Sequence, residues 1–167
     1  MQDDVDELVP GWQANGLSDS LIATLELSKR ISRLNGAMEQ AIRTEIAEFG
    51  LTYAEFDVLA ALLRAGAPHR LKPSELSRSL FLTSGGTSNV LQRLTTAGRI
   101  ERADNPGDGR SRWVQLTPEG LRIAEAAVTT AGRVHEQVMA GVSDDAIRRA
   151  ADALREINTI VGRRRLR

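Results

Sequence analysis

Apolar residues recur at spacings of three and four along most of this chain, which is the pattern of helices that bury one face. The longest run begins at Ser18, a helix-capping residue type, and ends at Gly50, which predicts one helix of about thirty residues. The same pattern predicts further helices at about 52–64, 72–80, 84–97, 118–140 and 143–161. The chain is therefore expected to be mainly α-helical.

The stretch 82–117 combines a short helix with a different pattern. Its helix carries an apolar stripe and ends at Ala97-Gly98, a helix-stop signal. Two runs of alternating β-formers follow, at 99–102 and 113–116, and the turn-forming segment 105–109 separates them. Together with the short helix predicted at 72–80, this order indicates a winged helix-turn-helix with a β-hairpin wing.

The outward face of that helix is small, uncharged and rich in hydrogen-bonding groups. It carries Gly85, Ser88, Asn89, Gln92 and Thr96, with Ser84 and Arg93 on its flanks. Such side chains pair with base edges and phosphates, whereas a face meant only for solvent would usually carry Glu and Lys. A merely polar surface helix is the alternative. The arginines of the hairpin, Arg102, Arg110 and Arg112, suit phosphates and the minor groove.

Composition narrows the function classes further. The 167 residues have a formal net charge of zero, but the stretch 82–117 holds five arginines against three acids. There is no cysteine, which excludes disulfides, thiolate catalysis and thiol-based redox sensing. The aromatic content of 4% argues against a stacking platform for single-stranded nucleic acid. No long apolar run or leader is present, so a soluble cytoplasmic protein with no membrane partner is expected.

Several motifs together resemble the multiple-antibiotic-resistance regulator (MarR) family of bacterial transcription factors. The most specific is DGRSRWVQLT at 108–117, which is similar to the family's wing pattern of Asp, then Arg two residues later, then a strand ending in Leu-Thr. Ser88-Asn89 and Arg93-Leu94 match the family's recognition helix, and Gly98 stands before the strand. The resemblance covers about residues 17–161.

This resemblance implies a homodimer, acting as a repressor, that binds double-stranded DNA at an inverted repeat. Two recognition helices would enter successive major grooves, Arg110 would be the wing-tip arginine, and Asp108 would hold it in place. An ion pair that merely closes the turn is the alternative for Asp108 and Arg110. No cofactor or metal is implied. The residues predicted to contact DNA are Ser84, Gly85, Thr87, Ser88, Asn89, Gln92, Arg93, Asp108, Arg110 and Arg112.

The family also implies release of DNA when a small, often aromatic, anionic effector binds. Trp12 and Asp57 resemble residues that the urate-responsive branch places near its ligand. That branch has an arginine beside Asn on the recognition helix, where this chain has Val90. The alternative for Trp12 is packing against the long helix, and the alternatives for Asp57 are facing a dimer seam or capping a neighbouring group.

Three regions are predicted: an irregular, acidic N-terminal arm at 1–16, a winged helix-turn-helix at 51–117, and a helical dimerisation layer from 17–50 and 118–167. The terminal helices are assigned to dimerisation because their apolar stripes are narrow. An enzyme is disfavoured, since the sequence holds no catalytic triad, phosphate loop or metal cluster. A structural winged-helix module that bridges DNA or proteins without an effector is the remaining alternative.

Overall fold

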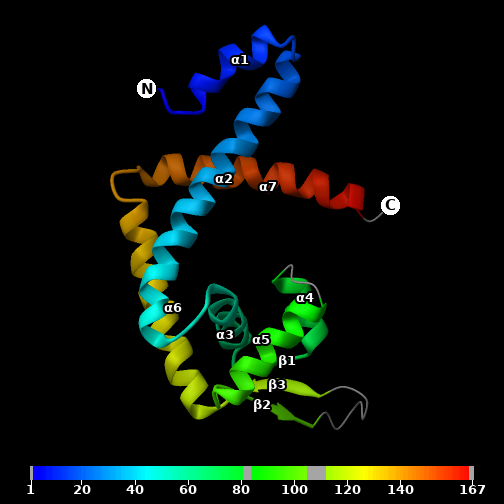
Figure 1. The fold of residues 1–167 in the computed structure, drawn as a ribbon, viewed down its shortest axis with the longest axis vertical. Helices are drawn as coiled ribbons and strands as arrows, with labels where there is room; N and C mark the ends of the chain where they lie inside the picture. The colour runs from blue at the N-terminus through cyan, green and yellow to red at the C-terminus, as the bar shows by residue number, and fades with distance from the viewer. Residues whose placement is uncertain (1, 81–83, 105–111, 166–167) are drawn as a thin grey trace. The chain divides into compact units, whose positions relative to one another are not determined.

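The structure is a computed structural model that describes residues 2–80, 84–104 and 112–165; of Ser84 and of residues 163–165 it describes the backbone only. The elements, with η marking 3-10 helices, are η1 (Asp6–Leu8), α1 (Val9–Ala14), α2 (Asp19–Ile46), η2 (Ala47–Phe49), α3 (Tyr53–Arg64), β1 (Arg70–Leu71), α4 (Pro73–Ser79), α5 (Ser84–Thr96), β2 (Ile100–Ala103), β3 (Trp113–Leu116), α6 (Pro118–Val138) and α7 (Asp144–Arg165) (Figure 1). The predicted mainly helical class with a small wing is confirmed.

The chain divides into two compact units, 1–135 and 136–167. The first holds every element from η1 to β3 and most of α6, and the second holds the last turn of α6 and all of α7. The winged helix-turn-helix therefore lies within the first unit. None of the helices in the described part of the chain is long and apolar enough to cross a membrane.

Helix ends lie where the capping residues predict them. The Ser18 hydroxyl accepts a hydrogen bond from the Leu21 amide at 3.4 Å and begins α2. Gly50, with φ of 62°, ends the following 3-10 turn in the left-handed region that favours glycine. Thr52 begins α3 with a capping box, in which Thr52 and Glu55 exchange side-chain-to-backbone hydrogen bonds.

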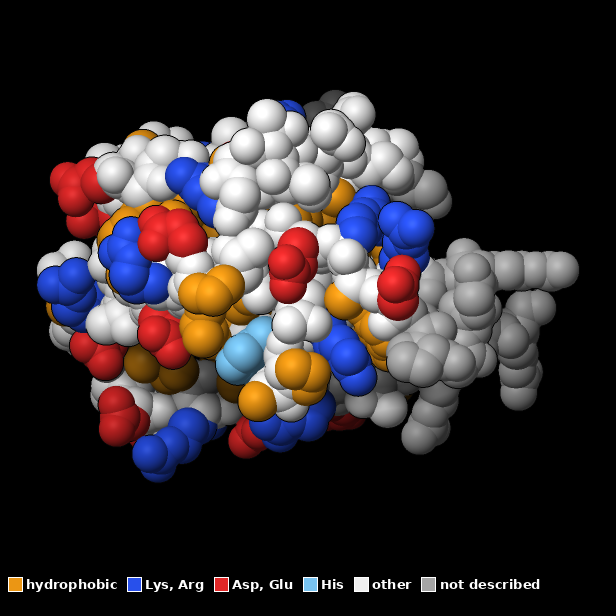
Figure 2. All heavy atoms as spheres, turned by 90° about the horizontal axis from the view of Figure 1, so that it is seen from below, with side chains coloured by type: hydrophobic (Ala, Val, Ile, Leu, Met, Phe, Trp, Pro, Cys, Tyr) orange, Lys and Arg blue, Asp and Glu red, His pale blue; other side chains and the backbone are white. Residues whose placement is uncertain are grey.

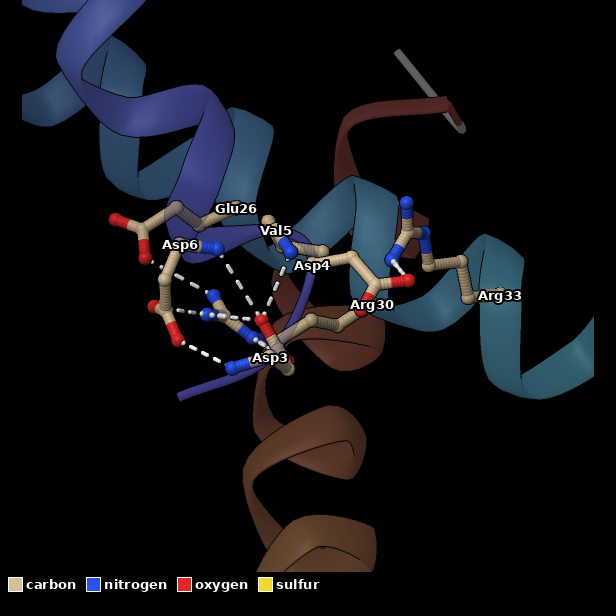
Figure 3. A network of polar contacts seen from close by, with 7 residues as sticks. All are labelled: Asp3, Asp4, Val5, Asp6, Glu26, Arg30 and Arg33. Carbon is tan, nitrogen blue, oxygen red and sulfur yellow. Dashed lines mark hydrogen bonds and ion pairs between the residues drawn. The ribbon is translucent and has the colours of Figure 1, made fainter. Parts of the chain in front are cut away.

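The N-terminal segment is helical, so the prediction of an irregular arm at 1–16 is wrong. Arg30 of α2 donates to Asp3 at 2.9 and 3.1 Å and to Asp6 at 2.8 Å, and it also pairs with Glu26 (Figure 3). The hydrogen bond from Arg30 lowers the pKa of the Asp3 carboxyl. The acidic residues that suggested a loose arm are thus the ones that fasten it to α2.

The wing belongs to a three-stranded antiparallel sheet of order β1-β3-β2, rather than to a two-stranded hairpin. Leu71 of β1 pairs with Val114 of β3, and Ile100 of β2 pairs with Leu116 of β3. Val114, Leu116 and Ile100 are buried, so these positions define the core face of the sheet. Strand β2 begins at Ile100, one residue later than predicted.

The core of the winged part is formed where α3 packs against α4, α5 and β3. Its fully buried side chains include Leu59 and Leu62 of α3, Leu76 of α4, and Leu91 and Leu94 of α5. Burying a leucine side chain contributes about 1.5 to 3 kcal/mol, so this cluster fixes α5 firmly on its support. The outward face of α5 is consequently held in one orientation.

Candidate nucleic-acid interface

Helix α5 has one buried face and one polar, exposed face. Val90, Leu91 and Leu94 are at most 5% exposed. The opposite face consists of exposed residues, namely Gly85, Ser88, Asn89, Gln92 and Thr96. The predicted division of the helix is therefore confirmed, and a row of amide and hydroxyl groups stands at the surface of the winged part.

Thr87 does not belong to that row. Its side chain is 2% exposed, and its hydroxyl accepts a hydrogen bond from Ser77 of α4 at 2.9 Å. The burial conflicts with the predicted contact between Thr87 and DNA. The burial of Thr87 could have been inferred from the sequence. Thr87 precedes Val90, Leu91 and Leu94 at spacings of three, four and seven, and so it continues the buried stripe.

Arg93, on the flank of α5, is oriented by a buried acid. Its Nε donates to Glu55 Oε1 of α3 at 2.9 Å; the Arg93 side chain is 55% exposed and that of Glu55 only 10%. The other Glu55 oxygen accepts from the Thr52 amide and hydroxyl, both at 2.8 Å. Burial alone would raise the pKa of Glu55, but the hydrogen bonds from Thr52 and Arg93 outweigh it and lower the pKa.

This Glu55–Arg93 pair was not predicted, because Glu55 resembles an ordinary capping-box acid in the sequence. The pairing joins α3 to the recognition helix over 38 residues of chain. It uses the Nε hydrogen of Arg93. The side chain remains more than half exposed, as a guanidinium that is to meet phosphate or a base edge must be.

The wing is described only in part. Arg112 is 70% exposed, and among the described residues it pairs with Asp104, at 3.8 Å and itself 93% exposed, which is a weak contact. Asp108 and Arg110, the predicted tip residues, lie outside the described residues. Figure 2 views the molecule from below, and on its described surface basic and acidic side chains are interspersed with uncharged ones.

The two predicted effector residues lie at opposite ends of α2. Trp12 is half-buried in α1, and its carbonyl accepts a hydrogen bond from Leu17, just before α2 begins. Asp57 is half-buried in α3; burial first, and then the charge of Glu39 on α2, raise its pKa. The helix from Asp19 to Glu39 spans about 30 Å. Within one chain, Trp12 and Asp57 are therefore not brought together.

Both histidines have a polar neighbour. Nδ1 of His69 lies 3.3 Å from the carbonyl oxygen of Leu63, and Nδ1 of His135 lies 2.8 Å from that of Ala131. Residues that could hold a metal ion are not grouped anywhere in the described part of the chain.

Comparisons with known proteins identify the family of this chain. A family model described as MarR family matches residues 49–111. The HTH-type transcriptional regulator PecS of Dickeya dadantii is 30% identical over 125 residues, which cover 75% of this chain and 75% of PecS. The chain belongs to the MarR family. It is accordingly a DNA-binding transcriptional regulator and not an enzyme.

Two further MarR-family relatives extend the similarity over most of the chain. The multiple antibiotic resistance protein MarR of Salmonella typhimurium is 28% identical over 131 residues, 78% of this chain and 89% of that protein. A solved structure of a MarR variant from Escherichia coli, complexed with operator DNA, matches with a TM-score of 0.72. It is 26% identical in sequence, and the match covers 84% of this chain and 99% of that one.

Proposed function

We propose that this MarR-family protein is a repressor that binds an inverted-repeat operator as a homodimer and releases it when a small aromatic, anionic effector binds. The observation that carries the DNA-reading part is α5, a helix with a firmly buried face and an exposed, uncharged, hydrogen-bonding face. The E. coli MarR variant of similar fold was crystallised with operator DNA.

In this proposal α5 enters the major groove. Asn89 and Gln92 have amide groups that can pair in a bidentate manner with adenine, and Arg93 can reach guanine or a phosphate while Glu55 holds its Nε. Ser84, Gly85 and Ser88 stand near the start of the helix, where side-chain hydroxyls and backbone amides suit phosphates. The wing residues Arg110 and Arg112 are assigned to the adjacent minor groove, with Asp108 holding Arg110 in place.

The homodimer is supported by apolar residues left exposed on α2. Leu27, Ile31 and Leu34 are 38%, 42% and 47% exposed and, at spacings of four and three, share one side of the helix. On α7, Ile157, Ile160 and Val161 are exposed in the same manner. Since such stripes suit helix–helix seams, we assign 17–50 and 118–167 to dimerisation, with 51–117 as the DNA-binding domain.

A mobility-shift assay on DNA upstream of the protein's own gene tests the proposal. Two-fold symmetry requires two inverted half-sites about 10 bp apart, one helical turn. Gln92→Ala is expected to change the preferred bases, whereas Arg110→Ala should weaken binding to all duplexes alike and lower the salt dependence. Preference for direct repeats would rule out the symmetric dimer.

The effector part rests on Asp57, because a half-buried carboxyl with a raised pKa marks a candidate functional site. Purines and phenolic acids are titrated into the protein–DNA complex, and loss of the shifted band is measured together with Trp fluorescence. Trp12→Phe and Asp57→Asn should each reduce the response. A complex that persists with every compound would favour the structural module without an effector.

A further inference from the structure

The solvent face of the sheet carries two cations stacked on one indole. The Arg70 guanidinium lies 5.1 Å from the centre of the Trp113 ring, and Lys72 Nζ lies 5.6 Å from it. Contacts within about 6 Å of a ring centre are attractive cation–π interactions. The indole of Trp113 in β3 therefore holds two positive charges close together, Arg70 in β1 and Lys72 directly after it.

The register explains why these three side chains share a face. Leu71 pairs with Val114, whose side chain is fully buried, so that pair points into the core. Side chains alternate along a strand, and therefore Arg70 and Trp113 point to the other side, away from the core. Lys72, directly after β1, reaches the same ring. Among the described residues, Arg70 forms no ion pair with an acid.

The position of this cluster links the two proposed DNA-contacting parts. Lys72 immediately precedes Pro73, the first residue of α4, which supports the recognition helix. Trp113 begins β3 and directly follows Arg112 of the wing. The cluster therefore lies where α4 begins and at the loop end of β3; both elements are labelled in Figure 1. On a duplex, the sugar–phosphate strand separates the major groove from the adjacent minor groove.

We propose that Arg70 and Lys72, held by Trp113, form a phosphate-binding site for the DNA strand between these two grooves. This rests on the proposed DNA-reading function and adds a third, sequence-independent contact to the helix and the wing. A guanidinium stacked on an aromatic ring keeps its N–H edge available for phosphate oxygens. Stacking also restricts two flexible side chains before DNA arrives.

The indole contributes through the face of its ring. Trp113 Nε1 is buried and has no hydrogen-bond partner among the described residues. Phenylalanine can therefore replace Trp113 without breaking a described hydrogen bond, while leucine removes the aromatic face. Comparing Trp113→Phe with Trp113→Leu separates stacking of the cations from simple packing of an apolar side chain.

The test measures affinity and its salt dependence for Arg70→Ala, Lys72→Ala and the two Trp113 variants. The probes are the duplex from upstream of the protein's own gene and an unrelated duplex of equal length. Each lost phosphate contact lowers the salt slope by about 0.9 and the affinity by about eightfold at 0.1 M salt. The loss should be equal on both duplexes. Lys29→Ala, which removes an exposed cation of α2, is the matched control and should behave as wild type.

The outcomes separate the two levels of proposal. Wild-type slopes and affinities in both Arg70→Ala and Lys72→Ala, with Gln92→Ala still altered, would overturn the phosphate site and leave the DNA-reading helix in place. A loss limited to one duplex would also overturn it, because a phosphate contact is independent of sequence. If Trp113→Leu weakens binding and Trp113→Phe does not, the stacked arrangement is supported. A wild-type protein that binds neither duplex would refute the proposed function itself.

Discussion

Gly120, near the start of α6, is the position where one added methyl group should do most damage. A Cβ atom built there would lie 1.7 Å from the carbonyl oxygen of Arg99 and 2.7 Å from its carbonyl carbon. Both are backbone atoms, so no side-chain rotation can relieve the collision. Hydrogen bonds from Thr117 hold the same two segments close to each other. The Thr117 amide donates to the carbonyl of Arg99, and the Thr117 hydroxyl donates to the carbonyl of Gly98 at 2.7 Å.

Gly120→Ala must therefore separate the start of α6 from the chain entering β2. Overpacking in a rigid environment costs about 1 to 3 kcal/mol, and a backbone collision falls at the upper end of that range. For a chain of this length, 3 kcal/mol lowers Tm by about 6 to 12 °C. Gly132→Ala on the same helix is the matched control: Gly132 is exposed and nothing lies within 4 Å of its added Cβ, so helix propensity should stabilise it by about 0.5 to 1 kcal/mol.

Thermal and urea unfolding of the two alanine variants, followed by circular dichroism, give the comparison. Gly120→Ala is expected to lower Tm and Gly132→Ala to raise it, although both place alanine for glycine on the same helix. Equal Tm values for Gly120→Ala and Gly132→Ala would refute the close approach of α6 to residue Arg99. DNA binding by the folded fraction of Gly120→Ala should also weaken, because residue 99 joins the recognition helix to the wing.

Four further substitutions test single residues. Glu55→Gln should lower the free energy of unfolding at pH 7 by about 1 to 3 kcal/mol. Burial alone would raise the pKa of Glu55, but its hydrogen bonds lower the pKa overall. The wild type should therefore lose this stability as the pH falls below the ordinary pKa of 4.5, and the variant should not. Asp57→Asn should raise Tm at pH 7, because burial and the neighbouring Glu39 raise the pKa of Asp57. The gain in Tm should vanish on acidification below the ordinary pKa of 3.8. A lower Tm of the variant at pH 7 would reveal a further group that stabilises the Asp57 carboxylate. Thr87→Val should cost about 1 kcal/mol in urea unfolding and leave base preference unchanged, whereas selection from a random duplex pool should find altered bases for Asn89→Ala.

The α-helices from α2 to α7 could be predicted from the sequence because their signals are local, whereas α1 was not predicted. Ser18, Thr52 and Gly50 act on backbone groups within three or four residues, and the apolar spacing of α5 reports directly which face is buried. The same local signals supplied the polar face of α5, which is the central part of the candidate interface. The alternating runs and the turn residues predicted the hairpin, and motif resemblance added only the roles expected of Asp108 and Arg110.

Features made by long-range pairing were missed. Strand β1 is two residues long, too short for an alternating pattern, and it exists because its backbone pairs with β3 more than forty residues away. The N-terminal acids suggested a solvated arm, since nothing in the sequence connects Asp3 with Arg30, 27 residues further on. Glu55 and Arg93 likewise meet only after α3 and α5 have packed.

Arg99 shows how the helices assigned to dimerisation can act on the DNA-reading part. Its guanidinium donates to the carbonyls of Phe49 at 2.9 Å and of Gly50 at 3.0 Å, at the end of the 3-10 turn that follows α2, while its own carbonyl accepts from Thr117 at the start of α6. One residue between α5 and β2 is thus fixed to both α2 and α6. The bond from the Thr117 amide joins backbone to backbone, so a shift at the start of α6 that keeps this bond also moves residue 99, and with it the end of α5 and the start of β2. The guanidinium bonds to Phe49 and Gly50 can instead adjust by rotation of the Arg99 side chain, so the α6 contact is the stiffer of the two connections.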